Sequence, residues 1–219
     1  DALNFANGIE RFSVLEFRPH FPGYPGMMAG AHLLAFLIDE NSAESALIYL
    51  SILGALLIPV LLAWLYYVLA GDRNVAFFVA LIAFASPLLN GLAISALSDA
   101  PAMVFFFGAL ILALKHHLFF PGVFLACMLA TRPAYLPIAL CFIPFIFMQS
   151  NRFQAFISAL FPVLLIGCMC MLYILSKDGM AYFSEGMRFT QGHFEIWGNT
   201  YGAQLQNESV YVDSYGVIK

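Results

Sequence analysis

Long apolar runs that contain almost no charged residues constrain this chain more than any other feature. A run of about 18 or more apolar residues can cross a hydrocarbon core of roughly 30 Å. Hydrophobic residues make up 62% of the 219 and charged residues only 10%, so a soluble fold would lack polar surface. The sequence therefore predicts an all-α, polytopic transmembrane helix bundle, with spans at about 43–70, 75–93, 100–114, 118–130, 134–148 and 153–174.

Three parts are expected along the chain. Residues 1–42 are predicted to be an extracytoplasmic loop with interfacial helices, one amphipathic over Asn4–Phe12 and one apolar over Met27–Ile38 that is too short to span. Residues 43–176 are predicted to form the bundle of about six helices, whose first helix has Asn41-Ser42 as a candidate N-cap and ends at Gly71-Asp72. Residues 177–219 are polar and aromatic, which indicates an extracytoplasmic loop or the start of a following subdomain. Because the chain opens without methionine and stops within this pattern, we expect it to be part of a longer protein.

The breaks between spans alternate between two faces, because each crossing changes the side. One face, called side one, contains residues 1–42, 95–99, 131–133 and those after 177. The other face, side two, contains the breaks at 71–74, 115–117 and 149–152. Of the 13 acidic residues only Asp72 falls on side two. Its short turns carry Arg73, Lys115 and Arg152, so the positive-inside rule makes side two cytoplasmic.

Asp99 and Arg132 are the strongest candidates for a functional site. Each lies in a very short break between apolar runs, where an unpaired charge is costly and a partner or a ligand is expected. For the other ionisable residues of side one, contact with water is the simpler explanation. The four cysteines all lie in apolar runs and are predicted to be buried thiols rather than disulfides or zinc ligands, and no basic run indicates nucleic acid.

Several short motifs, in this order, resemble the GT-C superfamily of membrane glycosyltransferases. They are the opening Asp1-Ala2-Leu3-Asn4-Phe5-Ala6, His20-Phe21-Pro22-Gly23-Tyr24-Pro25, Ser98-Asp99-Ala100-Pro101 and Thr131-Arg132-Pro133. The branch it is most similar to contains the protein O-mannosyltransferases and the bacterial enzymes that decorate lipid A with aminoarabinose. The resemblance covers about residues 1–144. The chain departs from that pattern at Ala2, where many members carry a second acid, and in lacking a lysine near His20.

The resemblance implies roles for individual residues. Asp1 matches the family's catalytic base, which takes the proton of the acceptor hydroxyl. Arg132 or Arg18 would stabilise the leaving lipid phosphate, Asp99 would position the acceptor or hold a cation, and His20 would bind phosphate or assist proton transfer. The remaining candidates for substrate binding are Glu16, Tyr24, His193 and Glu195. A surface loop held by Trp197 explains His193 and Glu195 equally well, and the segment Gly192–Gly198 is left unassigned.

The expected function is an inverting transfer of a sugar from a polyprenyl-phosphate donor to a lipid, glycan or protein acceptor. The resemblance implies an integral membrane protein, of the bacterial inner membrane, with its active site facing the periplasm or the exterior. No nucleotide is expected, because the chain lacks a glycine-rich phosphate loop, and a divalent metal is left open. A secondary transporter is the first alternative, since proline-broken helices also build midplane sites. A non-catalytic subunit of a membrane assembly is the second.

Overall fold

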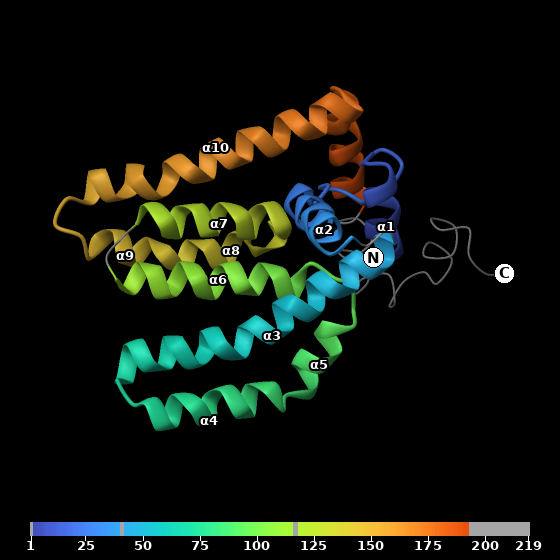
Figure 1. The fold of residues 1–219 in the computed structure, drawn as a ribbon. Helices are drawn as coiled ribbons and strands as arrows, with labels where there is room; N and C mark the ends of the chain where they lie inside the picture. Colours follow the sequence, from blue (N-terminus) through green and yellow to red (C-terminus); the bar gives the residue numbers. More distant parts are fainter. Residues whose placement is uncertain (1, 40–41, 116–117, 193–219) are drawn as a thin grey trace, which may run out of the picture.

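The chain forms a bundle of helices that run back and forth between two ends (Figure 1). The computed structural model describes residues 2–39, 42–115 and 118–192. Within these ranges the regular structure is helical, apart from one isolated β-bridge between Ser13 and Arg18. The prediction of an all-helical fold is therefore confirmed for the described part of the chain.

Two of the described helices are long and apolar enough to cross a membrane, α3 (Ala43–Ala70) and α10 (Arg152–Asp178). At roughly 1.5 Å per residue each is about 40 Å long. The Ser42 hydroxyl accepts a hydrogen bond from the Ser45 N–H, which confirms the predicted cap of α3, and Gly71 ends the helix at a φ of 75°. In α10 the Asn151 side chain caps the first turn. This helix extends beyond the predicted span 153–174 at both ends.

The run at 75–93, predicted as one helix, is divided in the structure. It forms α4 (Arg73–Phe84) and α5 (Pro87–Ala93), which are bent by 60° relative to each other. Ser86 is extended, because the residue before a proline is disfavoured in the α conformation and Pro87 has no N–H to donate. Counted as one broken span, this pair raises the number of candidate crossings among the described helices from two to three.

The run at 134–148 is also divided, into short pieces. These are η1 (Pro133–Tyr135), α8 (Leu136–Ala139), η2 (Leu140–Phe142) and α9 (Ile143–Phe147). Pro137 and Pro144 remove N–H donors, and the chain tightens into 3-10 turns around them. The other two predicted spans form α6 (Asp99–Leu114) and α7 (Phe119–Thr131), of 16 and 13 residues. A bundle with about six crossings therefore stays a prediction.

The N-terminal segment packs over one end of the bundle. It contains α1 (Ala2–Glu10) and α2 (Pro25–Ile38), which correspond to the two predicted interfacial helices. Both helices contact α3, and α2 also contacts α7 and α10. The buried side chains of the N-terminal segment form one core with the start of α3 and the end of α10. This core includes Phe5, Phe12, Tyr24, Met27, Met28, Leu47 and Ile174. Residues 181–192 form a further helix beside this core, which the sequence did not predict.

Successive long helices run in opposite directions, so the breaks predicted for one face lie at the same end of the bundle. The start of α6 and the end of α7 lie at the same end of the bundle as α1 and α2 (Figure 1). The turn from α3 to α4 and the turn before α10 lie at the opposite end. Side one and side two therefore correspond to the two ends of the described bundle.

Candidate functional site

Asp99 and Arg132 form an ion pair at the side-one end of the bundle. Asp99 is the first residue of α6, and Arg132 follows the last residue of the antiparallel α7, so the two helix ends meet. Arg132 Nε lies 3.0 Å from Asp99 Oδ1, and the two side chains are 27% and 21% exposed. The expectation that each charge needs a partner near the apolar bundle is met, because they are each other's partner.

Two further polar side chains complete this pair. Arg132 Nη1 donates a hydrogen bond of 2.9 Å to the hydroxyl of Ser98, a fully buried residue. The Tyr135 hydroxyl donates to Asp99 Oδ1 at 3.2 Å, and the Tyr135 ring centroid lies 5.5 Å from Arg132 Cζ. Sequence reasoning missed Tyr135, which it placed in the first turn of an apolar span. The signal that was available is its position three residues after Arg132, across the turn begun by Pro133.

The N-terminal segment adds His20 and Tyr24 to the neighbourhood of the pair. His20 Nε2 and the Tyr24 hydroxyl lie 3.1 Å apart in a hydrogen bond. Burial lowers the pKa of His20, and the positive charge of Arg132 lowers it further. Burial raises the pKa of Tyr24, while Arg132 opposes and Asp99 reinforces that rise. His20 is therefore favoured as neutral imidazole, and Tyr24 as a protonated phenol.

Gly26 explains how the N-terminal segment can approach so closely. A Cβ atom at this position would lie 2.7 Å from Ala130 C and from Thr131 N, at the end of α7 directly before Arg132. Only glycine lets the first turn of α2 rest on that backbone without displacement. His20 and Tyr24, which precede α2, are held near the ion pair by this contact.

Glu16 and Arg18 do not join this group. Their ion pairs are formed within the same loop, from Glu16 to Arg11 at 2.8 Å and to Arg18 at 3.7 Å, with all three side chains more than 40% exposed. Among the described residues neither pairs with Asp99 or Arg132. The predicted base Asp1 and the predicted ligands His193 and Glu195 lie outside the described residues.

The described ranges contain no group of three or more histidine, cysteine, aspartate or glutamate residues placed to hold a metal ion. The four cysteines are free thiols, but the prediction that they are buried is wrong for packing within the chain. Cys127 and Cys170 are partly exposed and Cys141 and Cys168 are exposed, because these positions face outward from the apolar helices.

Comparison with known proteins found no match. No family model, no curated protein and no solved structure is similar to this chain at a significant level.

An apolar groove lies beside Arg132, where α7 and α10 diverge. The two helices touch near side two, where a Cβ at Gly122 would lie 2.3 Å from the Ala159 carbonyl oxygen, and they separate toward side one (Figure 1). The groove has a volume of about 250 Å³. Its lining includes Leu129 and Pro133, from α7 and the turn after Arg132, with Val163, Gly167, Ile174 and Tyr182 opposite. We call it the α7–α10 groove.

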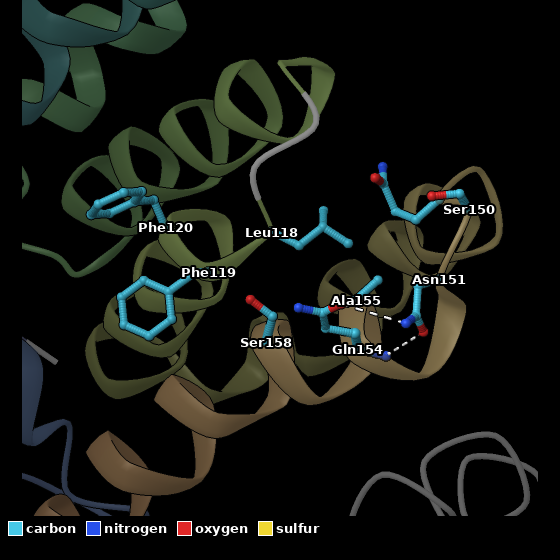
Figure 2. A pocket seen from close by; sticks show the side chains of 9 residues that line it. Leu118, Phe119, Phe120, Ser150, Asn151, Gln154, Ala155 and Ser158 are labelled. Carbon is cyan, nitrogen blue, oxygen red and sulfur yellow. Dashed lines mark hydrogen bonds between the residues drawn. The ribbon is translucent and has the colours of Figure 1, made fainter.

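A polar pocket of about 330 Å³ lies at the opposite end of the bundle (Figure 2). It is lined by Gln149, Ser150, Asn151, Gln154 and Ser158 together with the rings of Phe119 and Phe120. Its amides are engaged at helix ends: Asn151 Oδ1 accepts from the Gln154 N–H, and Gln149 Nε2 donates to the Phe145 carbonyl. This pocket is therefore separate from the candidate site and consists largely of helix-capping groups.

Proposed function

We propose that this chain is a membrane glycosyltransferase of the GT-C type. It would move a sugar from a polyprenyl-phosphate donor to a lipid, glycan or protein acceptor at the extracytoplasmic face. The observation that carries the proposal is the Asp99–Arg132 pair at the end of the bundle, with an apolar groove beginning at the adjoining Pro133. A phosphate attached to a long hydrocarbon needs such a combination of a guanidinium group and an apolar channel.

Arg132 retains donors for a phosphate. A guanidinium group has five N–H bonds. In Arg132 one Nη1–H donates to Ser98, while Nε lies 3.0 Å from Asp99 Oδ1 in an ion pair without a hydrogen bond. Arginine binds phosphate through two parallel hydrogen bonds, so the unused donors suit a lipid phosphate whose chain lies in the α7–α10 groove. Asp99 and Ser98 would fix the plane of the guanidinium group before the donor binds.

The proposed reaction is a single displacement with inversion. The acceptor hydroxyl attacks the anomeric carbon, Asp1 takes its proton, and the bond from that carbon to the phosphate oxygen breaks. The lipid phosphate leaves with the electron pair, and Arg132 stabilises its charge. Asp99 and Tyr135 would position the acceptor, while neutral His20 would accept or relay a proton. The proposal needs no nucleotide and leaves the need for a divalent metal open.

The proposed location is a bacterial inner membrane with side one facing outward. Arg73 and Arg152 begin α4 and α10 at the side-two end, and Lys115 follows α6 there. Short turns that carry cations are typical of the cytoplasmic face.

A secondary transporter remains the second candidate, and the broken pair α4–α5 is the observation that favours it. The groove at this break, about 510 Å³, is lined by apolar residues and Ser86, without an ionisable side chain. The charged residues of α3 and α10 lie in the first or last turn. A coupled transporter is expected to bury ionisable groups nearer the middle of a span. A non-catalytic subunit is disfavoured by the apolar groove beside Arg132.

The test is sugar transfer from a radiolabelled polyprenyl-phosphate sugar by the intact protein in membranes. We expect transfer to fall at least a hundredfold in Asp1→Asn and in Arg132→Gln, and to persist in Arg188→Gln, whose ion pair with Glu185 is exposed. Full activity of a folded Arg132→Gln protein would contradict the assigned phosphate site. Uptake of a solute without transfer would favour the transporter.

A further inference from the structure

Two adjoining hollows lie on the side of the bundle where α2 meets α10. The first is an apolar groove of about 590 Å³, lined by α2, α6, α7 and α10, and its lining includes Ala29, Leu33, Phe105, Ile166 and Met169. The second is a polar hollow of about 410 Å³, lined by the end of α1, the loop after it and the last turn of α10. His32 and Tyr173 line both. The apolar groove therefore opens into the polar hollow.

The polar hollow carries one unpaired charge of each sign. Glu10 and Lys177 both line it and are exposed, and within the described ranges neither forms an ion pair, with the other or with any residue. The third charged residue of the lining, Arg11, pairs with Glu16 at 2.8 Å. Lys177 lies in the last turn of α10, where a lysine reaches from the apolar region toward water, and its Nζ is 5.8 Å from the Tyr173 ring centroid.

We propose that these hollows together bind one zwitterionic phospholipid. An acyl chain lies in the apolar groove, the phosphate faces Lys177 and the headgroup ammonium faces Glu10. The match rests on charge complementarity, since a separated anion and cation on the headgroup meet a separated cation and anion on the protein. The groove volume lies within the range of small-molecule sites.

This lipid site differs from the proposed donor site and does not depend on sugar transfer. The α7–α10 groove begins at Pro133 and continues along Val163 and Gly167, whereas the lipid groove follows α2 as far as Leu33. The two grooves meet only at Pro25, Ala130 and Cys170. Loss of lipid binding can therefore be measured by itself.

The experiment compares retained lipids by native mass spectrometry of the intact protein in detergent. Phosphatidylethanolamine and phosphatidylglycerol with the same acyl chains are added in turn. We expect one phosphatidylethanolamine to be retained in preference to phosphatidylglycerol. Lys177→Gln should weaken retention of both about fivefold, and Glu10→Gln should remove the preference for phosphatidylethanolamine.

A second pair of variants tests the chain-binding part. Ala29→Trp fills the apolar groove and should abolish retention, whereas Phe36→Trp, on the same helix but outside the groove lining, should not. Equal retention by wild type, Lys177→Gln and Ala29→Trp would overturn the proposal, because it would indicate non-specific boundary lipid. A wild-type preference for phosphatidylglycerol would overturn the zwitterionic assignment.

Discussion

Arg132 Nε lies 3.0 Å from Asp99 Oδ1, and this contact ties the end of α7 to the first turn of α6. The pairing suits both helix ends. A carboxylate in a first turn and a cation just beyond a C-terminus each interact favourably with the partial charges of the helix ends. The pair therefore stabilises the bundle at the point where the proposed substrate phosphate binds. Different substitutions are expected to change the stability of the protein and its transfer activity to different extents.

Replacing Arg132 by lysine keeps the positive charge but removes the planar guanidinium group, whose paired N–H donors form a fork. We expect Arg132→Lys to lose the hydrogen bond to Ser98 and to lower the free energy of unfolding by about 1.5–3 kcal/mol, because hydrogen bonds to charged groups contribute this order. Sugar transfer should fall at least tenfold. Thermal unfolding in detergent and the transfer assay measure the two effects. The matched control is Arg188→Lys, an exposed arginine that should change neither; an unchanged Arg132→Lys protein would refute the role of the fork.

Tyr135→Phe removes one hydrogen bond and little volume. The hydroxyl donates to Asp99 Oδ1 at 3.2 Å, so its loss should lower the free energy of unfolding by about 1 kcal/mol. If Tyr135 positions Asp99 for the acceptor, KM for the acceptor should rise more than kcat falls. Tyr49→Phe, at an exposed tyrosine of α3, serves as the control. A kcat loss without any change in KM would argue against acceptor positioning.

Sequence reasoning predicted the parts of the fold that follow from apolar length and helix capping. The ends of α3 follow from Ser42 and Gly71, and the meeting of Asp99 with Arg132 follows from the alternation of helix directions. The break at Ser86 was missed. A continuous apolar run indicates that a segment can lie in lipid, but it does not show whether the backbone hydrogen bonds of the helix continue through the segment.

The lateral arrangement of the site could not be predicted in the same way. The alternation of helix directions assigns a residue to one end of the bundle, but it does not say where across that end the residue lies. Glu16 and Arg18 were therefore grouped with Asp99, although their contacts lie in their own loop. Tyr135 was overlooked because it was assigned to an apolar run, and its position three residues after Arg132 was not used.

His20 should make stability depend on pH. A histidine whose pKa is lowered in the folded state takes up a proton on unfolding, so stability is highest above its ordinary value of 6.5 and falls as the pH drops toward the lowered folded value. We expect the melting temperature to decrease between pH 7.5 and 5.5, and His20→Gln to remove part of that decrease. His32→Gln, on an exposed part of α2, should keep the wild-type slope. An identical slope in His20→Gln would contradict the prediction.

Gly26→Ala tests the contact between α2 and the end of α7. The added methyl would lie 2.7 Å from backbone atoms of Ala130 and Thr131, so α2 must shift, at a cost of about 1–3 kcal/mol. The same substitution at Gly91 of α5 meets no atom within 4 Å and should be neutral or slightly stabilising. Melting temperatures of the two variants measure the difference. Equal values would show that α2 does not rest on α7 as described.

Cysteine labelling tests the assignment of the two ends to the two faces of a membrane. In a variant with the four native cysteines replaced, Glu185→Cys lies at side one and Asn74→Cys, at the start of α4, lies at side two; position 185 is partly exposed and position 74 is exposed. If side one faces outward, an impermeant maleimide should label Glu185→Cys in intact cells and Asn74→Cys only after permeabilisation. The reverse pattern would place the Asp99–Arg132 site in the cytoplasm and exclude an extracytoplasmic transfer. Labelling of both positions in intact cells would mean that the two ends of the bundle do not lie on opposite faces, and the proposed membrane topology would be wrong.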